Sequence, residues 1–120
     1  MEQDYYKLRN SVISIASELY RFQSVFEKAI SKLEFSEQGK YQNQFSWFSK
    51  KVNKALEEAG LRLVKVEGQE YDPGMAVTPL NIEEFDVFDK LYVIQQIEPI
   101  VMEDDTVIKT GTVILGRVDK

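Results

Sequence analysis

The chain has 120 residues, which suits one domain with an extension but leaves no room for two enzyme-sized domains. Apolar residues make up 43% and charged residues 29%, as in ordinary globular proteins, and the formal net charge of −5 disfavours binding to nucleic-acid phosphates. The sequence has no cysteine and no histidine. These absences exclude disulfides, thiolate or histidine catalysis, and zinc sites built on either residue.

No signal-peptide pattern opens the sequence, and no apolar run approaches the roughly 18 residues of a membrane span. We therefore expect a cytoplasmic protein that binds neither membranes nor nucleic acid.

The two halves of the chain differ in composition. Residues 1–60 carry nine Lys/Arg and eight Asp/Glu, whereas residues 61–120 carry six and twelve. All three prolines and five of the six glycines lie from residue 60 onward. Because glycine and proline mark turns, the sequence predicts an α+β fold with a helical region over 1–60 and a β region over 61–120.

The helical region shows a clear period. Apolar residues recur at gaps of three and four from Tyr5 to Leu33, which predicts a helix with one apolar stripe. A break follows at residues 35–40, with Ser36 as a candidate N-cap, and a second helix is expected to end at Gly60. The first helix would be about 45 Å long. Sixty residues of mostly sheet cannot cover such a stripe, so we expect a partner chain.

Two antiparallel helices form a hairpin, and two hairpins form a four-helix bundle. We assign six apolar residues at heptad spacing to the dimer interface: Val12, Leu19, Phe22, Phe26, Phe45 and Phe48. Trp47 and Phe48 could also stack on nucleic-acid bases, but their helical register favours a core position.

The β region reads as a small antiparallel meander. Short β-prone segments at 61–66, 75–78, 91–97, 100–102, 106–109 and 112–115 are separated by turn residues. Pro73 and Gly74 predict a turn, and Glu103-Asp104-Asp105 predicts a hairpin tip. Gly111 is a candidate β-bulge.

No catalytic group of residues is present in the sequence. The acidic run at 103–105 lacks the ligand spacing of a calcium loop, so a solvated turn is the better interpretation. Four further acids could face a basic partner, although an exposed charged loop is the plainer interpretation: Glu83, Glu84, Asp86 and Asp89. No glycine-rich phosphate loop occurs. We expect a binding or scaffolding protein, not an enzyme, with no metal and no cofactor.

The order of features from Gly60 to Val118 resembles the GrpE family of nucleotide exchange factors. Three phrases carry the resemblance: Leu56-Glu-Glu-Ala-Gly-Leu-Arg-Leu63, then Gly68 followed by Tyr71-Asp72-Pro73, then a closing strand that reads Thr106-Val-Ile-Lys109-Thr-Gly-Thr112-Val113. The chain departs from the family where Met75-Ala76-Val77 follows Asp-Pro, and where Glu98-Pro99-Ile100 stands in place of a Gly-aromatic pair.

The resemblance implies a homodimeric co-chaperone that promotes ADP release from a DnaK-type chaperone ATPase. It places the partner contact on an exposed β face with four residues: Ile97, Thr106, Lys109 and Leu115. Two other interpretations remain open. One is a structural or regulatory adaptor with a helical dimerisation module, and the other, weaker one is an enzyme that relies on carboxylates.

Overall fold

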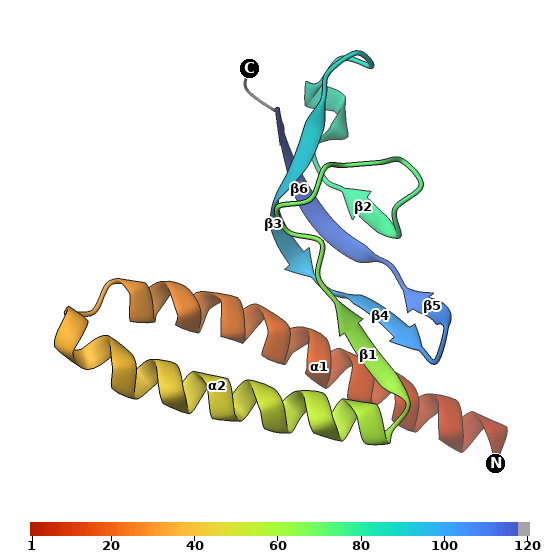
Figure 1. The fold of residues 1–120 in the computed structure, drawn as a ribbon. Helices are drawn as coiled ribbons and strands as arrows, with labels where there is room; N and C mark the ends of the chain where they lie inside the picture. Colours follow the sequence, from red (N-terminus) through yellow and green to blue (C-terminus); the bar gives the residue numbers. More distant parts are fainter. Residues whose placement is uncertain (118–120) are drawn as a thin grey trace. The chain divides into compact units, whose positions relative to one another are not determined.

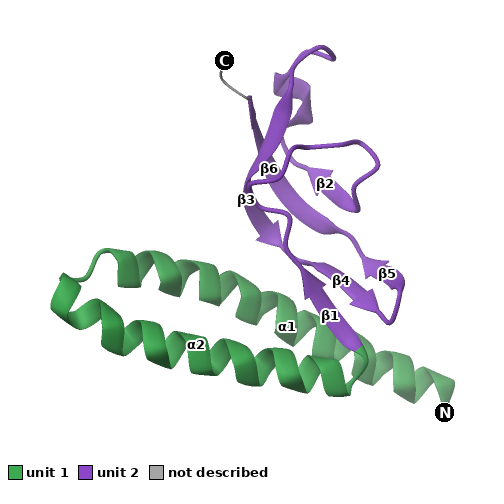
Figure 2. Cartoon of the chain, in the orientation of Figure 1, with its two compact units in different colours: residues 1–60 green, residues 61–120 purple. Residues whose placement is uncertain are grey.

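The computed structural model describes residues 1–117, and the chain divides into two compact units, residues 1–60 and 61–120 (Figure 2). Two long helices are followed by two small β-sheets, which confirms the expected α+β class (Figure 1). The boundary falls where glycine and proline become frequent. The last part of the expected β region, residues 118–120, lies outside the described residues.

The helical unit is an antiparallel pair, α1 (Glu2–Ser31) and α2 (Phe35–Glu58). Buried positions in α1 recur at helical spacing, at Ile13, Ala16 and Tyr20, which confirms the helical period; they lie one position after the predicted stripe, whose member Val12 is exposed. The end of α2 is also as expected, because Gly60 adopts a φ of 77°, a left-handed conformation that costs glycine little.

The start of α2 differs from the prediction. The helix begins at Phe35 with Glu34 as its N-cap residue, so the assignment of Ser36 as N-cap was wrong. The short turn leaves Glu34 as the last extended residue, with φ −61° and ψ 148°. A residue of α2 stabilises the turn, because the Gln38 side-chain amide donates hydrogen bonds to the carbonyl oxygens of Leu33 (3.0 Å) and Ser31 (3.4 Å). This side chain of α2 therefore satisfies carbonyl groups at the end of α1.

The β unit contains six strands in two sheets. The first sheet has the order β1-β4-β5 and is antiparallel: Leu61–Val64, Ile100–Glu103 and Thr106–Lys109. The second has the order β2-β6-β3: Val77–Pro79, Gly111–Arg117 and Leu91–Glu98. A short 3₁₀ helix, η1 (Ile82–Glu84), lies between β2 and β3 in the chain.

The β unit is not purely antiparallel, which corrects the sequence prediction. β2 runs parallel to β6, whereas β3 runs antiparallel to it on the other side. Before β2, the chain passes along the outer edge of β3, where Gly68 and Tyr71 donate backbone hydrogen bonds to Val93 and Leu91. The chain then crosses from the β3 edge of the sheet to the β6 edge, where it forms β2. Because it reaches β6 by this crossover and not by a hairpin, β2 runs parallel to β6.

Two of the predicted turns are confirmed. The Met75 N–H donates to the Asp72 carbonyl oxygen across Pro73 and Gly74, at 2.9 Å. The hairpin tip lies between β4 and β5, where Asp104 has a φ of 55°.

Register shifts occur in β3 and in the β4–β5 pair, between Val101 and Met102, and not at Gly111. The β3–β6 register shifts between Val93 and Gln95 and again between Gln96 and Glu98, so Ile94 and Ile97 are the extra residues. Gly111 is instead required by a close approach, since a Cβ there would lie 2.9 Å from the Glu98 carbonyl oxygen.

The first bulge turns a polar side chain into the interior. Gln96 is only 2% exposed. Its Oε1 accepts a hydrogen bond from the Val66 N–H at 2.7 Å, and its Nε2 donates to the Val64 carbonyl at 3.2 Å. Its own backbone N–H donates to the Glu67 carboxylate at 2.8 Å. One residue of β3 thus bonds the segment that leaves β1.

An apolar core cluster joins the two sheets of the β unit. Its buried members come from both sheets and from the segment after β1: Val66, Leu91, Val93, Ile100, Val113 and Leu115. Pro99, which joins β3 to β4, is also fully buried. The alternation along β6 decides which residues enter this core, because every second side chain of a strand points to the same side.

We predict that Gln96→Ala destabilises the β unit by about 2–4 kcal/mol, because it leaves the Val66 N–H and the Val64 carbonyl without partners. Gln95→Ala is the control, since Gln95 is exposed and its loss should cost less than about 0.5 kcal/mol. Urea unfolding of both variants gives the comparison. Equal stabilities would show that the buried amide does not hold the unit together.

Candidate interaction surfaces

The expected partner-binding residues do not form one surface. Lys109, at the end of β5, forms an ion pair with Glu98 at the end of β3, with 3.6 Å between Nζ and Oε2. The other carboxylate oxygen of Glu98 accepts a hydrogen bond from the Thr112 hydroxyl at 2.8 Å. Both charged side chains are about one-third exposed, at 36% and 33%. A partner that reaches Lys109 therefore meets an ion pair.

Ile97 precedes Glu98 of this ion pair in the chain, and Thr106 lies at the opposite end of β5 from Lys109. Ile97 is the bulged residue next to Glu98 and is half-buried, and Thr106 is exposed at the start of β5, opposite Glu103. Ile97, Glu98, Thr106 and Lys109, which we call the β3–β5 surface, are all at least partly accessible.

Leu115 does not belong to that surface. It is 1% exposed and lies in the core cluster, so the expectation that it contacts a partner from an exposed face was wrong. The reason is the phase of β6. Gly111, Val113 and Leu115 are the buried positions of this strand, and the residues between them are half-buried.

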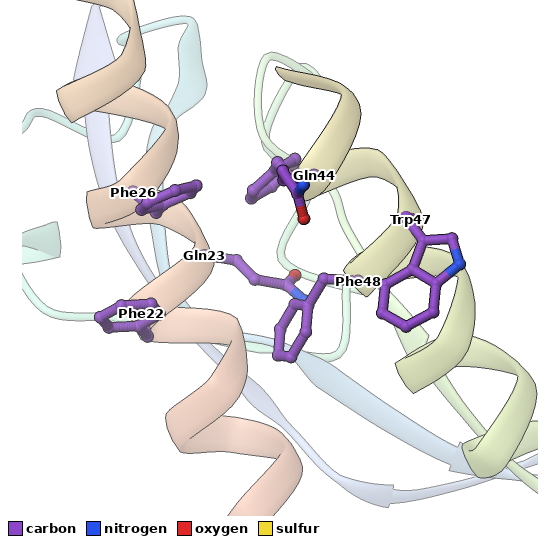
Figure 3. Close-up of a pocket in the computed structure, with 7 residues that line it drawn as sticks. Phe22, Gln23, Phe26, Gln44, Trp47 and Phe48 are labelled. Carbon is purple, nitrogen blue, oxygen red and sulfur yellow. The ribbon is translucent and has the colours of Figure 1, made fainter. Parts of the chain in front are cut away.

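The helical unit carries an apolar groove between its two helices (Figure 3). Its volume is about 270 Å³, and we call it the aromatic groove; its lining residues are Phe22, Gln23, Phe26, Gln44, Phe45, Trp47 and Phe48. The Phe26 ring stacks on Phe22 and on Phe45, with 6.0 Å between ring centroids in each pair. No lining residue carries a charge, so the groove suits apolar side chains.

Much of this aromatic surface is uncovered in the single chain. Phe22 is 60% exposed and Trp47 is 62% exposed, and Phe48 is exposed as well. The expectation that Trp47 and Phe48 are core residues was therefore wrong for one copy of the chain. Among the other residues assigned to the dimer interface, Val12 is exposed, and Leu19, Phe26 and Phe45 are half-buried.

A third feature was missed by the sequence analysis. Val87 and Phe88, which we call the apolar tip, are 89% and 91% exposed in the loop between η1 and β3. The sequence analysis noted only the acids of this loop. Two apolar residues between two aspartates, Asp86 and Asp89, were the signal that could have revealed it.

The loop that carries the apolar tip is closed by hydrogen bonds on both sides. The Asp86 N–H donates to Asp89 Oδ2 at 2.8 Å, and the Asp89 N–H donates to the Asp86 carbonyl at 3.0 Å. The Arg117 Nε donates to the same Asp89 oxygen at 3.2 Å, and its guanidinium lies over the Phe85 ring. The N–H of Asp86, and secondarily Arg117, lower the pKa of the Asp89 carboxyl below its ordinary value of 3.8.

Within residues 1–117, no three acidic side chains lie close enough together to hold a metal ion, and neither long helix is apolar enough to cross a membrane. Comparisons of the chain with protein-family models, with curated proteins and with solved structures found no match.

We predict that Asp89 titrates below 3.8 in the folded protein and that Arg117→Met raises this pKa only part of the way back, because the N–H of Asp86 is the larger cause. Because the pKa of Asp89 is lowered by folding, its carboxylate stabilises the folded protein at pH values above the ordinary pKa of this group. This contribution is lost as the pH falls through the pKa of the folded protein. The carboxyl ¹³C chemical shift of Asp89, followed against pH, measures both values. Full recovery of the ordinary pKa in the variant would reverse the order of the two causes.

Proposed function

We propose that the protein is a homodimeric, GrpE-like nucleotide exchange factor that acts in the cytoplasm and promotes ADP release from a DnaK-type chaperone ATPase. The observation that carries this proposal is the order of two structural units. A helical hairpin with an uncovered aromatic groove precedes a β unit, and this order of helical and β parts agrees with what the resemblance implies. The proposal rests on this architecture and on the sequence phrases, since no comparison supplied a relative.

The proposed activity is binding without chemistry. An exchange factor acts through a higher affinity for the open state of its partner's nucleotide cleft than for the closed state. Moving an equilibrium from 1:99 to 99:1 takes about 5.5 kcal/mol of such preference. Contacts of the β unit with the ATPase domain would provide this free energy.

The β3–β5 surface is the proposed contact in the β unit. It combines an apolar bulged residue, Ile97, with a hydroxyl, Thr106, and with the Lys109–Glu98 ion pair. The charges of Lys109 and Glu98 are partly accessible and paired with each other. An acidic and a basic side chain of a partner could bind next to them and form a network of four charges. Leu115 is buried in the core and is therefore not part of the proposed contact.

The aromatic groove is the proposed dimer contact. Phe22 and Trp47 would leave a large apolar area in water in the single chain, and contiguous exposed patches of this kind mark interaction sites. The helical unit is also nearly balanced in charge, with nine basic and eight acidic residues, so two copies would not repel each other strongly.

The first experiment measures release of a fluorescent ADP analogue from a DnaK-type ATPase of the source organism. We expect the protein to accelerate release, and Lys109→Met to weaken the effect about 10-fold at low ionic strength and less at high salt. The control Lys54→Met removes an exposed charge from α2 and should leave the rate unchanged. No acceleration by the unaltered protein would refute the exchange function and favour the adaptor interpretation.

The second experiment measures association by sedimentation at micromolar concentration. We expect a dimer, and we expect Phe22→Asp to shift it to monomer because the variant buries an unpaired charge in the contact. Phe35→Asp is the control, since Phe35 is 92% exposed but does not line the aromatic groove. A monomer before any substitution would contradict the dimer, as would equal effects of both variants.

A further inference from the structure

We propose that the apolar tip, Val87 and Phe88, is a docking element that inserts into an apolar socket with a basic rim on a partner protein. This inference does not depend on the nucleotide-exchange function. It rests on the exposure of the two side chains, on the hydrogen bonds that fix their loop, and on the charges around them.

The exposure of the tip is the first observation. Phe88 is 91% exposed and Val87 is 89% exposed, so neither packs on the chain that carries it. Neighbouring apolar residues of the same segment behave differently, since Phe85 is half-buried against the core cluster and Leu91 is buried in it. The segment buries part of the Phe85 ring against the core, but it leaves the Phe88 ring in solvent.

The loop is fixed before any partner arrives. Two hydrogen bonds between Asp86 and Asp89 close the turn, and Arg117 ties Asp89 to the end of β6. On the other side of β3, Lys90 forms an exposed ion pair with Glu70 at 3.9 Å. A fixed loop pays less ordering entropy on binding than a flexible one. A large, rigid aromatic side chain is also the type of residue that dominates interface energies.

The surrounding charges define the socket. Glu83, Glu84 and Asp86 are exposed and form no ion pair with any residue among 1–117. The tip also lines a groove of about 740 Å³ whose wall holds three acidic residues, Glu70, Asp86 and Asp89, and one basic residue, Lys90. A complementary partner therefore presents Lys or Arg around an apolar pocket.

The same charges argue against two other occupants. An anionic lipid surface would be repelled by the acids beside the tip. A second β unit would also be repelled, because residues 61–120 carry twelve acidic and six basic residues.

The first experiment places the photo-crosslinking amino acid benzoylphenylalanine at position 88 in the source cells, with position 35 as the control. Both positions are almost fully exposed, at 91% and 92%, and both have acidic residues nearby in the chain, but only position 88 lies on a closed loop, since position 35 begins α2. We expect a major adduct with one protein from position 88 only, mapped to an apolar residue with Lys or Arg beside it. Adducts mainly with lipid, with another copy of this chain, or equally from both positions would overturn the proposal.

The second experiment measures the affinity of the full chain for the protein so mapped. We expect Phe88→Ala to weaken binding by at least about 30-fold, as for an interface hot spot. Phe35→Ala should have no effect. Asp86→Asn should weaken binding less, and mainly at low salt, whereas Asp105→Asn at the β4–β5 turn should not. Unchanged affinity in Phe88→Ala, with the fold intact by circular dichroism, would refute the docking role.

Discussion

The β unit depends on one buried amide. Gln96 of β3 bonds both the carbonyl of Val64 and the N–H of Val66, at the point where the chain leaves β1. β1 belongs to one sheet and β3 to the other, so this amide holds the two sheets together. The chain itself crosses between the same sheets at the buried Pro99. Amide and proline together allow two small sheets to share one core.

A second amide completes the other sheet. The Asn81 side chain donates to the Leu115 carbonyl and accepts from the Leu115 N–H, both at 2.9 Å. It continues the parallel pairing of β2 with β6 beyond the point where the strand ends. Neither Gln96 nor Asn81 was singled out by the sequence analysis, because their roles follow from strand register. Register depends on the bulges in β3, which no local pattern revealed.

Features set by local periodicity were predicted well, and features set by long-range packing were not. The helical period, the end of α2 at Gly60 and the turn at Asp104 depend on a few neighbouring residues, and the structure has them as expected, although the buried face of α1 is shifted by one position from the predicted stripe. The parallel direction of β2 depends on a crossover between distant segments. Leu115 was misplaced for a related reason, since alternation predicts which residues share a face but not which face is inside.

The surfaces of the two units differ in chemistry, and this difference separates their roles. The aromatic groove is uncharged and belongs to a unit with nine basic and eight acidic residues, so contact with an identical copy meets little repulsion. The apolar tip belongs to a unit with twelve acidic and six basic residues, where contact between identical copies is opposed. Under the proposals above, electrostatics would favour self-association through the helices and a different, basic partner for the β unit.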